Sequence, residues 1–155
     1  MGGRDKLLVI QKKLFETDIT KGNNRFSIPL RQIVRTDFLT EEEKEKFRAG
    51  QEIRVQFIDP MLESGRVVLV QWDMPKDTGN TSSTYALRST WNKVRESNGL
   101  KIDDVVQLWS FRVATKKLAM MLLLLIQTKD GFVLRLCWLR KQRMNSQCQA
   151  LVFKV

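Results

Sequence analysis

The chain has 155 residues, of which 43% are hydrophobic and 28% charged, a balance that excludes a wholly disordered chain and predicts one globular domain. It contains no histidine, so the commonest general base and most zinc sites are missing, which argues against most hydrolases and zinc enzymes. The 27 lysines and arginines against 17 aspartates and glutamates give a net charge of +10, which favours a polyanionic partner.

No segment of the sequence predicts a membrane span or an export signal. The longest apolar run, 118–126, has nine residues, against about 20 needed to cross a bilayer as a helix. The first six residues lack the apolar stretch of a secretory signal, so we expect an intracellular protein. In that compartment Cys137 and Cys148 stay reduced, and we interpret both as packing residues.

The positive charge is unevenly distributed along the chain. Residues 1–40 hold eight basic and four acidic side chains, residues 41–75 hold five and eight, and residues 76–155 hold fourteen and five. An acidic middle between basic flanks favours one directed polyanion-binding surface. The alternative is the solvated surface of an ordinary basic protein.

Two helices are predicted before the first long strand. The segment 29–34 begins with proline and places three apolar residues on one stripe, which predicts a short helix. Thr40 and Glu43 have the spacing of a capping box, which predicts a second helix ending before Gly50. Because 41–45 is net negative, we expect this helix to lie away from a polyanionic partner, with a structural role or a partner-binding role.

Strands dominate the middle of the sequence. Alternating apolar residues predict a strand over 51–57, and the β-branched run 66–72 predicts its hairpin partner. A further strand is expected at 85–87. After it, Ser89 or Thr90 can cap a short helix that stops at Asn98-Gly99.

The last predicted elements lie between residue 104 and the basic tail. Residues 104–113 predict a strand whose more apolar face carries Val105, Trp109 and Phe111. Asp130-Gly131 predicts a two-residue turn between strands at 120–129 and 132–139. Beyond it, 140–143 forms a short basic cluster that either contacts phosphate or is a surplus tail.

Two polar inserts interrupt this pattern, at 20–25 and 74–84, and both are predicted to be loops. They combine short hydrogen-bonding side chains with Lys21, Arg25 and Lys76, which is the chemistry that contacts phosphates and base edges. Taken singly, each insert is more simply explained as a connector. The presence of two on a basic chain favours a binding surface.

Catalytic patterns are weak in this sequence. Asp103 and Asp104 are adjacent, so in a strand they would point to opposite faces, and a turn-capping role is favoured. Residues 42–44 match the residue types of a nuclease motif, but they lie in the capped helix among solvated charges. No glycine-rich phosphate loop is present in the sequence. Three of the four tryptophans are expected in the core, with base stacking as the minority interpretation. We therefore expect no enzyme activity, no metal and no cofactor.

The order of three segments resembles the plant B3 DNA-binding domain, and in particular its small, divergent single-domain branch. The segments are 14–19 leading into Asn24-Arg25-Phe26-Ser27-Ile28-Pro29, then Ser82-Ser83-Thr84-Tyr85-Ala86-Leu87, and last Leu100-Lys101-Ile102-Asp103-Asp104-Val105-Val106. The resemblance covers about residues 14–126. It implies a mainly β fold with short helices, a seven-stranded open pseudo-barrel, and a nuclear transcription regulator that binds double-stranded DNA.

The resemblance also implies that two loops, an N-arm and a C-arm, enter the major groove, and these fall on the two polar inserts. The expected DNA-binding residues are Lys21, Asn23, Asn24, Arg25, Lys76, Thr78, Asn80, Ser82, Ser83 and Thr84. Among them, Arg25 and Asn80 are expected at base edges, and Lys21, Lys76 and Ser82 at phosphates.

The expected organisation is an N-terminal extension at 1–10, a B3-like domain at 11–127 and a basic extension at 128–155 with an extra hairpin strand. Double-stranded DNA is the expected partner, with no membrane and no small-molecule substrate, and the sequence names no protein partner. Two departures from the family pattern, Gly79 in the C-arm and Asp103 before Asp-Val, leave an alternative. In it, the same fold is a protein-interaction module that has lost DNA binding.

Overall fold

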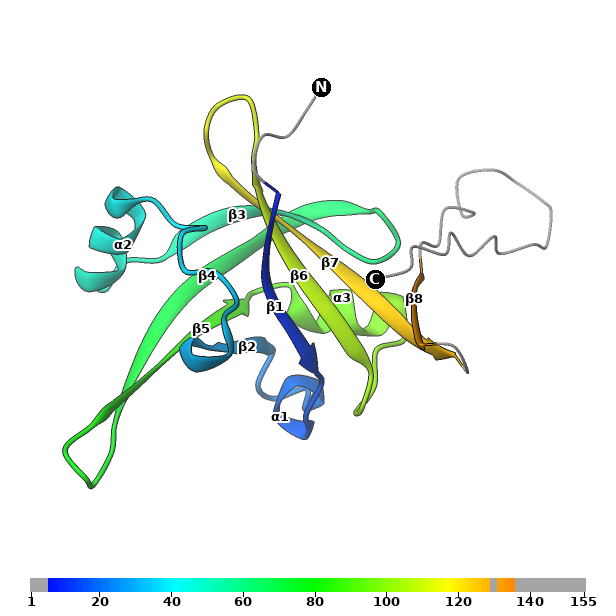
Figure 1. Cartoon of the computed structure of the whole chain (residues 1–155), viewed down its shortest axis with the longest axis horizontal. Helices are drawn as coiled ribbons and strands as arrows, with labels where there is room; N and C mark the ends of the chain where they lie inside the picture. Colours follow the sequence, from blue (N-terminus) through cyan, green and yellow to red (C-terminus); the bar gives the residue numbers. More distant parts are fainter. Residues whose placement is uncertain (1–5, 129–130, 136–155) are drawn as a thin grey trace.

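The computed structural model describes residues 6–128 and 131–135, which form one strongly curved sheet with short helices at its margins (Figure 1). The strands are β1 (Leu7–Lys13), β2 (Arg25–Pro29), β3 (Ile53–Ile58), β4 (Ser64–Pro75), β5 (Thr81–Arg88), β6 (Val105–Arg112), β7 (Leu118–Thr128) and β8 (Gly131–Arg135). The helices are α1 (Glu16–Ile19), the 3-10 helix η1 (Leu30–Gln32), α2 (Glu41–Arg48) and α3 (Trp91–Asn98). The predicted features at Cys137, Cys148, Trp138 and 140–143 lie outside the described residues.

Seven strands follow the order β1-β6-β7-β3-β4-β5-β2, which confirms the predicted seven-stranded open pseudo-barrel. All neighbours are antiparallel except β3 and β7, which run parallel with Gln56 opposite Ala119. The eighth strand, β8, pairs with the later part of β7, with Thr128 opposite Gly131. The predicted antiparallel pairing of a further strand with β7 is therefore confirmed over 131–135. Gly131 belongs to β8 and not to the turn, and residues 129–130 lie outside the described residues. The added strand covers part of an edge of β7 that would otherwise lack a partner.

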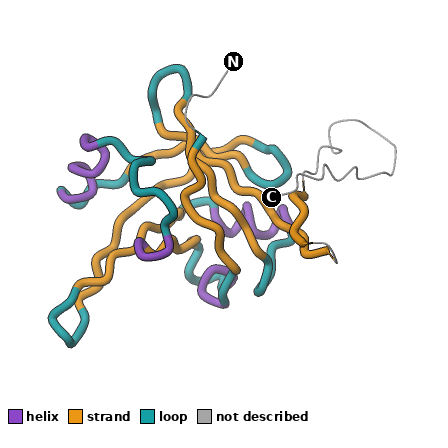
Figure 2. Tube along the Cα trace, in the orientation of Figure 1, coloured by secondary structure: helices purple, strands orange, loops and turns teal. Residues whose placement is uncertain are grey.

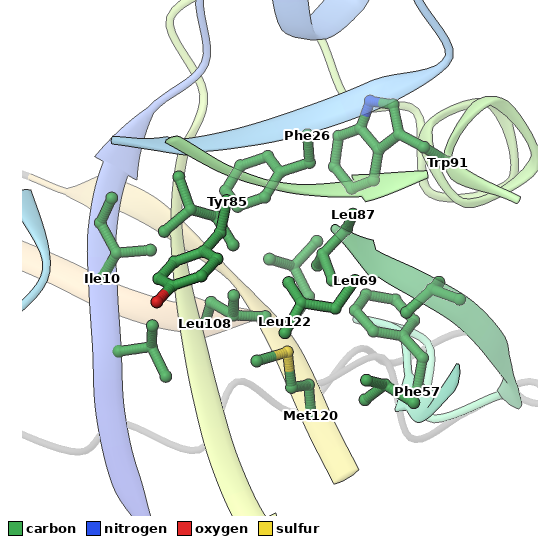
Figure 3. Close-up of a cluster of buried hydrophobic side chains, with 14 of the residues drawn as sticks. Ile10, Phe26, Phe57, Leu69, Tyr85, Leu87, Trp91, Leu108, Met120 and Leu122 are labelled. Carbon is green, nitrogen blue, oxygen red and sulfur yellow. The ribbon is translucent and has the colours of Figure 1, made fainter. Parts of the chain in front are cut away.

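The inner face of the barrel is the hydrophobic core. Figure 3 shows buried side chains from around the barrel meeting there, and the fully buried members include Ile10, Phe26, Leu69, Leu87, Leu108, Met120 and Leu122. Burying one such side chain contributes roughly 1.5 to 3 kcal/mol. This packing makes the barrel a rigid base for the loops at its rim.

The capping box in the sequence predicted the start of α2 correctly. Thr40 Oγ1 accepts a hydrogen bond from the Glu43 backbone N–H, and Glu43 Oε2 accepts one from the Thr40 N–H, as the capping box predicts. Phe47 is the buried anchor of this helix. The four glutamates each have a basic partner: Glu41 pairs with Lys44, Glu42 with Lys46, Glu45 with Arg48, and Glu43 with Arg112. The negative charge expected of this helix is therefore balanced within the fold.

Two predicted elements differ from the structure, and one element of the structure was not predicted. The helix expected at 29–34 is only the single turn η1, because Pro29 is held in β2 opposite Thr84 and the Val34 N–H donates to the Val9 carbonyl. The loop expected at 74–84 is mostly strand, since β4 and β5 stay paired from Trp72 to Pro75. The sequence interpretation also missed the short helix α1.

The more apolar face of β6 is not the face that packs into the core. Val106 and Leu108 point into the core and are fully buried, whereas Trp109 is half-buried on the other face, where its Nε1–H donates to Gln107. Of the three tryptophans in the described residues only Trp91 is in the core, so the expectation of three core tryptophans is wrong. Trp72 lies half-exposed on the sheet surface, where it takes part in the site described next.

Candidate nucleic-acid interface

The N-arm, defined here as residues 16–25, is anchored by a buried ion pair. Lys12 Nζ lies 2.8 Å from Asp18 Oδ2, with the two side chains 2% and 0% exposed. The same ammonium donates to the Ser27 carbonyl at 2.7 Å and to Ser27 Oγ at 2.9 Å. Burial lowers the pKa of Lys12, while the hydrogen bond and charge of Asp18 oppose that shift.

Asp18 collects further donors around this ion pair. Its carboxylate accepts hydrogen bonds from the backbone N–H groups of Phe15 and Ser27, and its carbonyl accepts one from Trp91 Nε1 at 2.6 Å. A single residue thus links α1 to β1, β2 and α3. Although Asp18 lies in the N-arm, its side chain is buried and serves the fold.

A second anchor joins the far end of the N-arm to α3. Asn24 Oδ1 accepts from the Asn92 backbone N–H at 2.8 Å, and Asn24 Nδ2 donates to the Ser89 carbonyl at 3.2 Å. Asn92 Nδ2 in turn donates to the Lys21 carbonyl at 2.9 Å. Asn24 adopts a φ of +42°, a left-handed conformation that asparagine tolerates better than most residues.

These bonds correct the predicted cap of α3. Thr90 occupies the N-cap position, but its hydroxyl donates to the Arg66 carbonyl and makes no cap hydrogen bond. Asn24 supplies that cap from another part of the chain. Both polar atoms of Asn24 are therefore engaged by the fold, which favours a positioning role for this residue.

The C-arm, defined here as residues 73–83, is the outer part of the β4–β5 hairpin. Figure 1 shows this hairpin projecting well beyond the barrel, and Figure 2 shows strand structure continuing almost to its tip. The turn is closed by hydrogen bonds from the Lys76 N–H to the Asn80 carbonyl and from the Gly79 N–H to the Lys76 carbonyl. Gly79 has a φ of +81°, a conformation that favours glycine.

The predicted C-arm residues divide by exposure. Lys76, Thr78 and Asn80 are exposed at the tip. Ser83 is half-buried, with its hydroxyl 2.5 Å from Asp73 Oδ1, and this bond lowers the pKa of Asp73. Thr84 is only 8% exposed at the base of the hairpin, so its side chain has little surface to offer a partner.

An arginine at the end of the N-arm contacts a tryptophan next to the base of the C-arm. Arg25 begins β2 and its guanidinium carbon is 5.0 Å from the centroid of the Trp72 ring, a cation–π contact that orients the arginine. Arg88 is paired with Arg25 across β2 and β5 and is exposed. The sheet surface between the arms therefore carries two guanidinium groups.

The two arms lie at the same end of the barrel. In Figure 1 the hairpin tip and α1 both extend downward, and the loop that joins β6 to β7 lies at the opposite end. Among the described residues, the exposed cations Lys13, Lys21, Lys76 and Arg88 have no ion pair. The arms also carry exposed carboxylates, at Glu16, Asp73 and Asp77.

Four residues that form or anchor this site were not among the predicted site residues, namely Lys12, Trp72, Arg88 and Asn92. Lys12 could have been recognised from the sequence, because it alternates with Ile10 and Leu14 and so shares their buried side of the chain. A lysine buried in this way needs a partner for its charge. Trp72 was assigned to a strand, and Arg88 follows directly after the strand predicted at 85–87, but no local pattern showed which face of the sheet either would occupy.

The described residues give no sign of a metal centre or a membrane-crossing helix. They contain no group of three histidine, cysteine, aspartate or glutamate side chains that could hold a metal ion. No helix in 6–128 is long and apolar enough to span a membrane.

The family model described as B3 domain-containing protein At2g31720-like matches residues 1–125. The chain belongs to this B3 domain family. Relatives from Arabidopsis thaliana include B3 domain-containing protein At3g25182, 36% identical over 115 residues that cover 70% of this chain and 33% of the relative. At5g24050 is likewise 36% identical over 115 residues, with the same coverage of both chains.

The B3 chain spans about a third of the length of these relatives. Among solved structures, a similarity is found to the Arabidopsis FUS3–DNA complex, with a TM-score of 0.49 and 20% identity. It covers 75% of this chain and 96% of the other. The predicted membership of the B3 family is thus confirmed by the family model and the relatives.

Proposed function

We propose that this B3 domain binds double-stranded DNA through its N-arm and C-arm and acts as a non-enzymatic regulator of transcription in the nucleus. The proposal rests on one observation above all. Two polar arms project from the same end of the barrel, and the sheet between them carries Arg25 and Arg88. A hairpin and a loop of this kind are narrow enough to enter a major groove about 12 Å wide.

The arm residues take different roles in this proposal. Arg25 contacts base edges, because a guanidinium group held against Trp72 is pre-oriented for paired hydrogen bonds to guanine. Asn80 and Thr78, exposed at the C-arm tip, supply further base contacts. Lys21 and Lys76 contact phosphates, assisted by Asn23, Ser82 and Ser83.

Asn24 and Thr84 contribute indirectly. Asn24 positions the N-arm against α3 through its two backbone contacts. Thr84 supports the base of the C-arm from its buried position opposite Pro29 and Trp72. Residues 11–127 form the binding domain in this account, and 1–10 and 128–155 are extensions.

The second candidate function is a protein-interaction module on the same fold, and one observation favours it. The exposed carboxylates Glu16, Asp73 and Asp77 nearly balance the cations of the arms, which weakens attraction to phosphate. The two departures from the family pattern give it less support. Gly79 and Asp103 both lie in turns with positive φ, at +81° and +73°, where they serve backbone geometry.

Three alanine variants on a panel of duplexes test the proposal. Arg25→Ala should cost about 1 to 3 kcal/mol of binding and relax preference at one base position. Lys76→Ala should weaken all duplexes equally, because phosphates carry no sequence information. Lys117→Ala, at the opposite end of the barrel, is the matched control and should change affinity by less than about twofold. Equal effects of Arg25→Ala and Lys117→Ala would refute the arm assignment.

A further inference from the structure

A basic cleft lies at the end of the barrel opposite the arms. Its volume is about 550 Å³, and it is lined by β3, the start of β4 and the loop that joins β6 to β7. Figure 1 shows that loop at the opposite end of the molecule from the C-arm tip and α1. The cleft is therefore separate from the surface that we propose for DNA.

Strand register and the loop that joins β6 to β7 bring three cations together in this cleft. Gln56 of β3 faces Arg66 of β4 directly, and Arg54 lies two residues before Gln56 on the same face of the sheet. Cross-strand neighbours of this kind lie about 5 to 8 Å apart. Lys117, in the loop before β7, lines the same cleft.

No carboxylate lies within the cleft to neutralise these cations. Arg54, Arg66 and Lys117 all line the cleft, and no carboxylate is among its lining residues. In the described part of the chain none of the three forms an ion pair, whereas Arg35, Arg48, Arg95 and Arg112 all do. Three like charges held within one cleft repel one another, and a bound anion would relieve this repulsion.

The shape of the cleft indicates a compact ligand. Its volume falls within the roughly 300 to 1,000 Å³ of small-molecule sites, and a duplex would need a broad surface. Gln56, Ser64 and Thr115 add hydrogen-bonding groups to the lining, and Val55, Val113 and Leu118 add an apolar portion. Guanidinium groups bind phosphate through paired hydrogen bonds.

We propose that this cleft is a second anion site, which takes a compact ligand bearing two or more phosphate groups through Arg54, Arg66 and Lys117. The ligand is either a free polyphosphorylated small molecule or a doubly phosphorylated peptide segment. The site acts independently of the arms, so the proposal holds whether or not the arms bind DNA.

Calorimetric titration of the full chain with tripolyphosphate tests the site. The wild type should bind saturably with one site outside the arms, and Arg54→Gln/Arg66→Gln should bind at least about tenfold more weakly. The control Arg31→Gln/Lys101→Gln removes the same charge from exposed, unpaired positions outside the cleft and should stay within about twofold. Arg54→Lys/Arg66→Lys should retain part of the affinity, which excludes a folding defect.

Two further measurements complete the test. The affinity of a peptide with two adjacent phosphoserines is measured as well, with its unphosphorylated form as the control. Whichever of the phosphopeptide and tripolyphosphate binds more tightly, in a way that depends on Arg54 and Arg66, shows whether the ligand is a peptide segment or a free small molecule. Duplex affinity of Arg54→Gln/Arg66→Gln should match that of the control. Three results would each overturn the proposal. They are equal losses of tripolyphosphate binding in Arg54→Gln/Arg66→Gln and in the control, no saturable binding by the wild type, and a tenfold loss of duplex affinity in Arg54→Gln/Arg66→Gln.

Discussion

Replacing Lys12 by methionine tests the buried anchor of the N-arm. The substitution keeps the apolar length of the side chain but removes the ammonium that binds Asp18 and both oxygens of Ser27. Breaking a buried ion pair from one side typically costs 3 to 5 kcal/mol, because the remaining charge stays buried without its partner. Asp18 retains donors from Phe15 and Ser27, so we expect the lower end, about 3 kcal/mol.

Urea unfolding followed by tryptophan fluorescence measures this cost, because Trp91 donates a hydrogen bond to the Asp18 carbonyl. The double variant Lys12→Met/Asp18→Asn has no buried charge at this site. Its loss of stability should therefore be smaller than the sum of the losses of the two single variants. The control Lys13→Met alters an exposed lysine on the same strand and should change stability by less than about 0.5 kcal/mol. A loss below about 1 kcal/mol for Lys12→Met would refute the anchoring role.

The pH dependence of the same pair has a definite sign. Burial lowers the pKa of Lys12 below its usual 10.5, so the folded state binds fewer protons than the unfolded state between the lowered pKa and 10.5. Stability therefore rises with pH across that window. Asp18→Asn removes the interactions that oppose the shift, so its stability should rise more steeply with pH below 10.5 than that of the wild type. Parallel curves of stability against pH for the wild type and Asp18→Asn would show that Asp18 does not oppose the shift in the pKa of Lys12.

Two further predictions concern helix ends and acid stability. Asn24→Ala should lose about 1 to 2 kcal/mol of stability in the same urea assay, because it removes the cap of α3, whereas Asn23→Ala in the same loop should lose less than about 0.5 kcal/mol. Asn24→Gly keeps the positive φ unstrained and isolates the cap; an unchanged stability in both Asn24 variants would contradict the capping role. Burial opposes ionisation of Glu43, but hydrogen bonds from Arg112 and Thr40 outweigh it and hold the pKa of Glu43 below its usual 4.5. The stability that the Glu43–Arg112 pair contributes is therefore complete above about pH 4.5 and is lost as the pH falls through the lowered pKa. Acid denaturation curves of the wild type and Arg112→Met should converge at low pH. Curves that keep a constant separation would refute this contribution.

Local patterns predicted most of the barrel. The capping box of Thr40 and Glu43 involves residues three apart, and the alternation at Ile53, Val55 and Phe57 reports a strand with one buried face. The outer C-arm escaped detection because a two-stranded ribbon with both faces in solvent has no apolar period. Its polar residues were therefore interpreted as a loop.

Non-local contacts account for the remaining differences. Asn24 caps α3 across 68 residues, and Lys12 meets Asp18 only because α1 folds back on β1. Neither contact has a sequence spacing that identifies it. The inward face of β6 was missed because both faces of the strand carry apolar residues, and only packing inside the barrel decides between Leu108 and Trp109.

The central claim is that the two arms hold double-stranded DNA, and the salt dependence of duplex binding tests it most directly. Four exposed, unpaired cations near the arms, Lys13, Lys21, Lys76 and Arg88, correspond to about four phosphate contacts. Between about 50 and 200 mM salt, log affinity should then fall against log salt with a slope of about −4, and Lys21→Ala/Lys76→Ala should reduce its magnitude by about 2. A slope near zero, or no duplex binding at about 50 mM salt, would contradict the account and favour the protein-interaction module.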